Sequence, residues 1–309
     1  MESSSLYFFK KENKDYYKNK NILITGATGG IGQVLVRTLY DLGANLLLIS
    51  HNENKIKEKF NNLLKDEEES IKDNESNDSG RLHFNPLNQI QYEIIDLEDP
   101  KSINSKFPIC MKKLRAKLDN IFICHGIYEK SPIKECSKEK FDKIMNINVR
   151  SVFHILSLSV PFLKISKGNC VIISSMESFI PVKDGFLNTT TKAMINSLVQ
   201  NSALELSSFG VRINAVAPGL TNTDHRKEKN NDNNYNIGIM WNSLGNMDNN
   251  INNNDGEKFL LNKKILEPTN IVDTMLFLGS DEASFITGEI IQNDNGYGLN
   301  HDLSFTKES

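Results

Sequence analysis

Residues 25–32 read Thr25-Gly26-Ala27-Thr28-Gly29-Gly30-Ile31-Gly32, a glycine-rich loop between two apolar segments. The short apolar run at 21–24 predicts a β-strand before the loop, and residues 31–42 predict a helix after it. In such a loop the first glycine permits a tight turn, the second lets the backbone approach a pyrophosphate, and the third lets the helix pack close to the strand. The helix N-terminus offers unpaired N–H groups to an anion. The loop therefore predicts the start of a βαβ unit that binds a dinucleotide.

Strand and helix signals alternate along the chain from Asn21 to Gln292. Short apolar runs of this kind are typical of strands that are covered on both faces. They predict seven strands, at 21–24, 46–49, 90–95, 120–124, 170–174, 211–217 and 289–292. The alternation predicts an α/β fold in which a doubly wound parallel sheet carries helices on both faces. We expect this single domain to occupy residues 21–300.

Three polar segments interrupt the alternation, at 1–20, 65–79 and 230–254. Residues 65–79 contain seven acidic residues, and residues 230–254 contain twelve asparagines. Such segments cannot bury enough apolar area to offset the entropy of ordering, so loops or disorder are predicted. The domain is therefore expected to have a polar N-terminal extension (1–20), low-complexity insertions near 62–88 and 226–258, and a tail (301–309). An apolar island at 237–241 is interpreted as the remnant of a lid helix.

Composition excludes several classes of protein. The 309 residues carry a formal net charge of −3, without the basic field that attracts nucleic acid. No apolar run approaches the ~20 residues that a membrane span needs, and the N-terminal segment lacks the apolar region of a signal peptide. The four cysteines form no C-x-x-C pair and the six histidines are dispersed, so we expect no metal site. We expect a cytoplasmic protein that binds a small molecule, with no nucleic acid or membrane partner.

Further motifs follow the glycine loop in a fixed order. Asn148 lies in a helical stretch, Ser175 follows the fifth predicted strand, and Lys192 lies in the next helix. With the Thr-Gly-x-x-x-Gly-x-Gly loop, they resemble the short-chain dehydrogenase/reductase family over residues 21–296, in particular carbonyl reductases and 3-oxoacyl-carrier-protein reductases. The resemblance implies a Rossmann fold. It also implies an oxidoreductase that transfers a hydride between a nicotinamide cofactor and a carbonyl/alcohol or acyl-thioester substrate.

The resemblance also implies cofactor contacts at the ends of the predicted strands. Ser50 stands where NAD enzymes commonly have an acidic residue that binds the ribose 2′-OH, and His51 where NADP-dependent relatives often have arginine. Without a carboxylate to repel a 2′-phosphate, NADP is favoured as the cofactor, and NAD remains possible. Asp96 and Leu97 match the position of the adenine-contacting aspartate. The other expected contacts are Thr25, Gly26, Thr28, Gly30, Ile31, Gly32, Gly126, Lys192, Pro218, Gly219 and Thr221.

One position departs from the family pattern. The run Asn188-Thr189-Thr190-Thr191-Lys192 has the frame of a Tyr-x-x-x-Lys signature, with asparagine in place of the proton-donating tyrosine. By resemblance, Lys192 holds the nicotinamide ribose, Ser175 hydrogen-bonds the substrate carbonyl and Asn148 positions a water relay. A carboxamide has no usable proton near neutral pH, and losing a general acid typically costs ~10²–10⁴ in rate. The predicted catalytic set of Asn148, Ser175, Asn188 and Lys192 therefore lacks its usual acid.

Three hypotheses for the function remain open. In the first, a substitute acid protonates the substrate, and Glu177 is the nearest titratable candidate, although a solvated loop residue is the alternative interpretation of this carboxylate. In the second, the chain is a catalytically impaired dinucleotide-binding protein that acts as a sensor or partner. In the third, the reaction needs little acid help, as in some enoyl reductions.

Two predicted helices bear on assembly. Residues 141–162 are apolar almost all round, and residues 189–206 are amphipathic. Together they would expose a large apolar patch in a monomer. Relatives bury these two helices in a four-helix contact between subunits, so the resemblance implies a homodimer or homotetramer.

Overall fold

The computed structural model describes residues 16–75, 89–223 and 265–299. Several segments singled out in the sequence therefore lie outside the described residues. These are most of the N-terminal extension, the end of the first insertion, the second insertion with its apolar island, and the tail 301–309.

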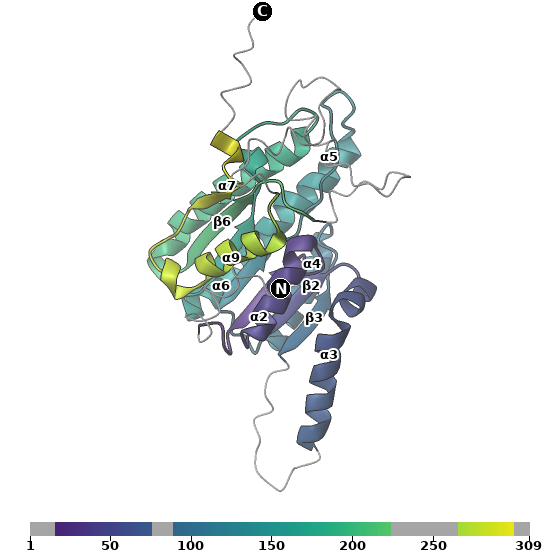
Figure 1. Cartoon of the computed structure of the whole chain (residues 1–309), viewed down its shortest axis with the longest axis vertical. Coiled ribbons are helices and arrows are strands. Elements are labelled where there is room, and N and C mark those ends of the chain that lie inside the picture. The colour runs from purple at the N-terminus through teal and green to yellow at the C-terminus, as the bar shows by residue number, and fades with distance from the viewer. Residues whose placement is uncertain (1–15, 76–88, 224–264, 300–309) are drawn as a thin grey trace, which may run out of the picture.

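A sheet of seven parallel strands forms the centre of the molecule (Figure 1), which confirms the predicted α/β fold. Each strand lies within one or two residues of its predicted position. The strands are β1 (Asn21–Thr25), β2 (Asn45–Ser50), β3 (Ile90–Ile94), β4 (Asn120–Ile123), β5 (Asn169–Ile173), β6 (Arg212–Pro218) and β7 (Ile290–Asn293). Their order is β3-β2-β1-β4-β5-β6-β7, so the direction of winding reverses between β1 and β4. In such sheets, ligands bind at the carboxyl ends of the strands beside this reversal.

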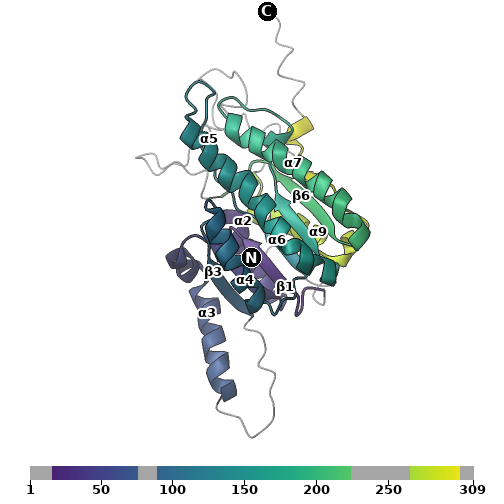
Figure 2. The same ribbon diagram turned by 180° about the vertical axis from the view of Figure 1, so that it is seen from behind.

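Helices cover both faces of the sheet (Figures 1 and 2). On one face lie α4 (Pro100–Lys113), α6 (Ser151–Ser166) and α7 (Phe186–Leu206); on the other lie α2 (Gly30–Asp41), α3 (Glu53–Glu75) and α9 (Pro268–Gly279). Because side chains alternate along a strand, β1 contributes Leu23 to the first core, and Ile22 and Ile24 to the second. The sheet is therefore buried on both faces, as its continuous apolar strands predicted.

The longest continuous helical stretch of the described residues combines three elements. It runs from α5 (Lys138–Met145) through the π-helical segment η1 (Asn146–Arg150) into α6. By length and composition alone this stretch could cross a membrane, but Val152, Ile155 and Leu163 pack in the core beneath the sheet. The predicted all-round apolar helix thus has a buried face and an exposed face.

Two sequence expectations need correction. Residues 65–75, expected in a loop or disordered, continue helix α3 to Glu75 after a kink at Phe60. The physical reason is that lysine and glutamate, which dominate this stretch, are good helix formers even where no apolar face is present. The polar extension also ends earlier than residue 20, because Tyr17 is fully buried and donates a hydrogen bond to the carbonyl of Leu276 at 2.5 Å.

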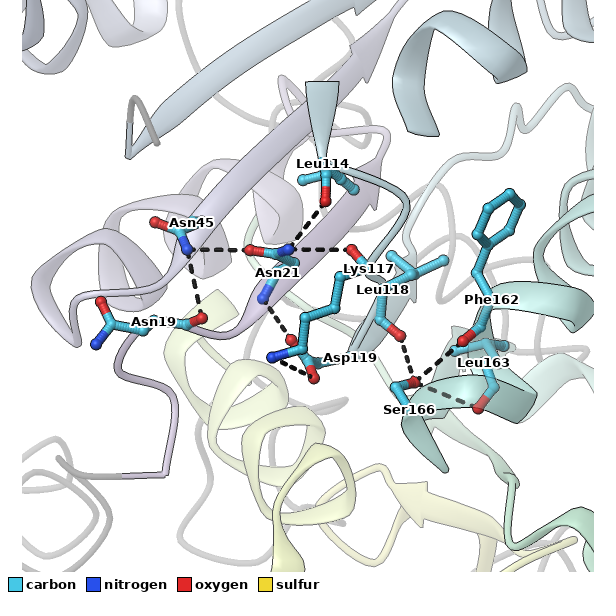
Figure 3. Close-up of polar contacts among 10 residues, drawn as sticks. All are labelled: Asn19, Asn21, Asn45, Leu114, Lys117, Leu118, Asp119, Phe162, Leu163 and Ser166. Carbon is cyan, nitrogen blue, oxygen red and sulfur yellow. Dashed lines mark hydrogen bonds and ion pairs between the residues drawn. The ribbon is translucent and has the colours of Figure 1, made fainter. Parts of the chain in front are cut away.

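A hydrogen-bonded cluster fixes the amino end of the sheet (Figure 3). The amide of Asn21 donates to the carbonyls of Leu114 and Lys117, both at 3.1 Å, and the backbone N–H of Asn21 donates to the Asp119 carboxylate at 2.8 Å. The Asn45 amide donates to the Asn21 side-chain oxygen at 3.0 Å. These bonds tie β1 to β2 and to the segment before β4. They therefore hold these strands together at their amino ends, opposite the carboxyl ends where ligands bind in such sheets.

Candidate active site

The glycine loop fits the pyrophosphate of a dinucleotide. Gly26 has a φ of 65°, and a Cβ there would lie 2.6 Å from the backbone nitrogen of His125. A Cβ on Gly32 would collide with the carbonyl oxygen of Gly26. Helix α2 then begins after Gly29 with no side-chain cap and no acidic residue in its first turn. Its first N–H groups can therefore bind an anion, as the sequence predicted.

Thr223 is a neighbour of this loop that the sequence did not reveal. A Cβ on Gly30 would lie 2.6 Å from the Cβ of Thr223, so glycine is required here to admit this side chain as well as to let a ligand approach. Thr223 is brought there by the segment that begins at Pro218. In this segment Gly219 packs against Asp294, since a Cβ added to Gly219 would lie 2.6 Å from the Cα of Asp294. The buried Thr221 hydroxyl donates a hydrogen bond to the Gly219 carbonyl at 3.0 Å.

The residues expected to bind the adenosine half lie at the ends of β2 and β3, on the carboxyl edge. Ser50 is buried, and its hydroxyl accepts from the backbone N–H of Asn52 at 3.2 Å. His51 and Asp96 are exposed, and Asp96 accepts from the N–H of Glu98 at 2.9 Å. The Leu97 side chain is partly buried and packs against the core. Of Ser50 and His51, the two residues expected beside the ribose 2′ position, His51 is thus the more accessible.

His125 joins the glycine loop to helix α6. Its Nδ1 lies 2.7 Å from the Thr25 hydroxyl and its Nε2 lies 2.6 Å from the Ser151 hydroxyl. Because Ser151 donates its own proton to the carbonyl of Ile147 at 2.6 Å, it must accept from Nε2–H, which leaves Nδ1 to accept from Thr25. Burial, and then the charge of Lys192, lower the pKa of His125 to about 3, so the ring is neutral near pH 7.

Asn148 holds the loop that follows β4. Its side-chain oxygen accepts from the N–H of Ile127 at 2.8 Å, and its amide donates to the carbonyl of the same residue at 2.9 Å. Asn148 lies in the π-helical segment η1, a geometry that is frequent at functional sites. A Cβ on Gly126 would lie 3.5 Å from the Asn148 oxygen and 3.6 Å from Lys192 Nζ, so Gly126 leaves the space between them narrow but open.

Lys192 lies at the centre of the site. Its Nζ donates to the carbonyl of Ile173 at 2.8 Å, and the side chain is 8% exposed. Burial lowers the pKa of Lys192 to about 8, while the nearby Glu177 and Cys124 oppose this shift. The lysine therefore changes charge close to physiological pH.

The altered position Asn188 faces a carboxylate. Asn188 is buried at the start of α7, and its amide donates to Glu177 Oε2 at 2.5 Å. Glu177, in the short segment η2 (Met176–Ser178), is 2% exposed and is therefore not the solvated loop residue that was the alternative interpretation. Ser175 accepts from the N–H of Glu177 at 3.2 Å, and its own hydroxyl proton has no acceptor among the described residues. The site thus contains a free hydroxyl donor, an amide, a lysine and a carboxylate.

The fold brings the predicted site residues together at one edge of the sheet. Thr28 and Ile31 are half-buried in the glycine loop, and Thr25 is fully buried and turned toward His125. The four predicted catalytic residues come from η1, α7 and the end of β5. No three metal-ligating side chains are grouped in the described part of the chain.

Two protein families match the chain. The family described as "short chain dehydrogenase" matches residues 20–73, and the one described as "Enoyl-(Acyl carrier protein) reductase" matches residues 88–298. Among individual relatives, a tropinone reductase homologue of Arabidopsis thaliana is 28% identical over 288 residues, covering 91% of this chain and 93% of the relative. A 3alpha-hydroxysteroid dehydrogenase of Mediterraneibacter gnavus is 26% identical over 282 residues, covering 90% of this chain and 96% of the relative.

Solved structures share the fold. A short-chain dehydrogenase/reductase from Brucella melitensis, described as a glucose/ribitol dehydrogenase, has a TM-score of 0.71 at 21% identity, covering 91% of this chain and 98% of its own. A 3-ketoacyl-(acyl-carrier-protein) reductase from the same organism, complexed with NADH, has a TM-score of 0.69 at 18% identity, covering 91% and 99%.

Proposed function

The chain belongs to the short-chain dehydrogenase/reductase family of nicotinamide-dependent oxidoreductases, and from this premise we propose that it is an NADP-preferring enzyme. Its reaction is hydride transfer between the nicotinamide and a carbonyl/alcohol or acyl-thioester substrate. The observation that carries the proposal is the grouping of Ser175, Asn148 and Lys192 beside an uncapped helix N-terminus. Each of these groups is of the chemical type that hydride transfer to a carbonyl needs.

Each side chain has a distinct task in this reaction. A bound nicotinamide supplies the hydride, which is one hydrogen with two electrons. Ser175 donates its hydroxyl proton in a hydrogen bond to the substrate oxygen, where negative charge develops. Lys192 holds the nicotinamide ribose, and Asn148 keeps the loop at Gly126 in place. These groups bind and orient, and none of them is an obvious source of the proton that the substrate oxygen must receive.

The preference for NADP rests on the end of β2. Ser50 leaves no carboxylate to repel a 2′-phosphate, and the exposed His51 forms no hydrogen bond with the described residues. Calorimetry with NADPH and NADH should show tighter binding of NADPH. Ser50→Asp should reverse the order, because it adds a negative charge beside the 2′ position. NADH bound tenfold more tightly by the unmodified protein, about 1.4 kcal/mol, would contradict the preference.

The activity itself is tested by following NADPH oxidation with three substrate classes: ketones, 3-oxoacyl thioesters and enoyl thioesters. We expect turnover with at least one class. Ser175→Ala should lower kcat by ~10²–10³, as for the loss of one donor to a developing oxyanion. Turnover that does not respond to this substitution would mean that the reaction proceeds elsewhere.

A second candidate function follows from Asn188. Its amide occupies the position of the usual acid and is hydrogen-bonded to Glu177. A protein with this site could bind the dinucleotide as a sensor or partner without useful catalysis. Tight NADPH binding without turnover on all three substrate classes would favour this function over the enzyme.

We also propose a homodimer or homotetramer, supported by apolar side chains that α6 and α7 expose. A cytoplasmic location is proposed from the four cysteines, all of which are free thiols. The partner in the reaction is a small molecule, and neither nucleic acid nor membrane is part of the proposal.

A further inference from the structure

Glu177 is a buried carboxylate, and one of its two oxygens has no hydrogen-bond partner among the described residues. Its side chain is 2% exposed, and its Oε2 accepts the Asn188 amide at 2.5 Å. The other oxygen, Oε1, forms no hydrogen bond within residues 16–75, 89–223 and 265–299. Oε1 is also not one of the fully enclosed side-chain atoms that lack a partner in this part of the chain. An oxygen left open in this way, inside a site, is available to a ligand.

Glu177 lies beside the residues that bind the substrate and the cofactor in the proposed reaction. Its backbone N–H donates to the hydroxyl of Ser175, the residue that binds the substrate oxygen in the proposed reaction. Its Oε2 lies near Gly185, where an added Cβ would be 3.6 Å away. Its charge interacts with Lys192, which holds the nicotinamide ribose in the same proposal. Glu177 is thus the one carboxylate among the described residues that contacts the predicted catalytic set.

We propose that Glu177 is the proton donor of this active site and that Asn188 is its positioning residue. The proposal rests on the hydride-transfer function proposed above. In the family pattern, a tyrosine at this position gives the proton. Here Asn188 gives no proton, but it orients Glu177, which does.

The hydrogen bond from Asn188 suits this role in both protonation states. An amide N–H can donate to Oε2 whether or not Oε1 carries a proton. The proton is therefore directed to Oε1, the oxygen that no described residue contacts by a hydrogen bond. An aspartate at position 188 would place a second carboxylate there, and the two would compete for the proton.

The step balances without a further reactant. The hydride adds to the carbonyl carbon, and the π electron pair of the C=O bond moves to the oxygen. That oxygen takes the proton from Oε1 as the O–H bond of the carboxyl group breaks. The products are the alcohol, the oxidised nicotinamide and the Glu177 carboxylate, which the Lys192 ammonium stabilises. A proton from solvent restores the acid before the next turnover.

The first test is Glu177→Gln, which preserves shape and the acceptor for Asn188 but removes the acid. We expect kcat to fall by ~10²–10⁴ on the best carbonyl substrate, with NADPH affinity and far-ultraviolet circular dichroism unchanged. The matched control is Glu205→Gln, which removes an exposed carboxylate from α7 and should leave kcat unchanged. An unchanged kcat in Glu177→Gln would overturn the proposal while leaving the proposed function intact.

The second test separates proton donation from a structural role. The double variant Glu177→Gln with Asn188→Tyr places a phenol beside Lys192, so it should recover at least about tenfold in kcat over Glu177→Gln alone. Failure to recover, in a double variant that still binds NADPH, would indicate that Glu177 acts otherwise. If the unmodified protein binds NADPH but turns over none of the three substrate classes, both the proposed function and this assignment are overturned.

Discussion

At the scale of the residue, the site depends on buried groups whose protonation is set by their surroundings. His125 is neutral because its ring is enclosed between Thr25 and Ser151, far from water. Lys192 is close to losing its proton because burial penalises the ammonium. The two shifts have different consequences. The first keeps the hydrogen-bonded His125 ring uncharged, and the second makes the charge of Lys192, the residue predicted to bind the nicotinamide ribose, sensitive to pH.

His125 should make folding stability depend on pH. Its pKa is about 3 in the folded protein and ~6.5 in the unfolded chain, so between these values the unfolded chain binds more protons. Stability from this group is therefore complete above pH 6.5 and is lost as pH falls, by ~2 kcal/mol at pH 5.

His125→Ala removes this dependence and is checked by urea unfolding at the two pH values. At pH 7 the variant should be less stable by ~2–3 kcal/mol, because the hydroxyls of Thr25 and Ser151 lose a partner. At pH 5 the deficit should shrink by ~2 kcal/mol, since only the unmodified protein contains the buried imidazole. An equal deficit at both pH values would contradict the neutral, buried ring.

Lys192 should make cofactor affinity depend on pH. Its ammonium form prevails below a pKa of about 8 and supplies both charge and hydrogen-bond donors. The affinity for NADPH should therefore be constant at lower pH and fall above the pKa, by up to about tenfold per pH unit. Calorimetry between pH 7 and 10 measures this. The Lys192→Met variant should bind NADPH more weakly, with an affinity that does not change over this pH range. A pH-dependent fall in affinity that persists in this variant would mean that another group titrates.

At the scale of the element, the turn between β1 and α2 and the π-helical segment η1 position the site. The turn brings Gly26 against the backbone after β4, so two loops on either side of the winding reversal touch. The segment η1 directs Asn148 toward Ile127 in the second of these loops. The turn depends on a positive φ at Gly26, which few residues other than glycine accept.

Gly26→Ala tests the turn, with Gly43→Ala as its matched control. Both glycines have a positive φ, which costs an alanine about 1–2 kcal/mol. A Cβ on Gly26 would also meet the backbone of His125 at 2.6 Å, whereas a Cβ on Gly43 has 3.5 Å of space. Both variants should lose stability in thermal unfolding, and only Gly26→Ala should weaken NADPH binding, by at least about tenfold. If Gly26→Ala and Gly43→Ala bind NADPH with equal affinity, the turn has no part in the cofactor site.

At the scale of the whole molecule, the helices on one face leave apolar side chains exposed. On α6, Phe153 is 58% and Ile165 is 78% exposed; on α7, Leu204 is 77% exposed. Helix α7 packs beside α5 and η1, so these side chains belong to one helical layer (Figure 2). Single exposed apolar residues are ordinary, but several on adjoining helices mark an interaction surface.

This surface predicts the oligomeric state. Light scattering at micromolar concentration should give a mass of at least two subunits, each of 35.0 kDa. Phe153→Glu combined with Leu204→Glu should shift the mass toward one subunit, because charges would have to be buried in the contact. Ile133→Glu is the control, since Ile133 is 73% exposed but lies between β4 and α5. A mass of one subunit for the unmodified protein would exclude the assembly.

The sequence by itself determined the architecture. Apolar runs and the glycine loop are local signals, because strand burial and tight turns depend on neighbouring residues. For this reason the seven strands and the edge that holds Ser175 and Lys192 were predictable. The helical continuation of α3 to Glu75 was missed, because a helix rich in glutamate and lysine has the same composition as a disordered segment.

Only the tertiary structure decided how distant residues meet. Three contacts follow from the packing of segments that lie far apart in the sequence. Thr223 fills the space over Gly30. His125 bridges Thr25 and Ser151, and Asn188 holds a buried Glu177. No local pattern encodes such contacts, because the burial and pKa of a polar side chain depend on what the folded chain places around it.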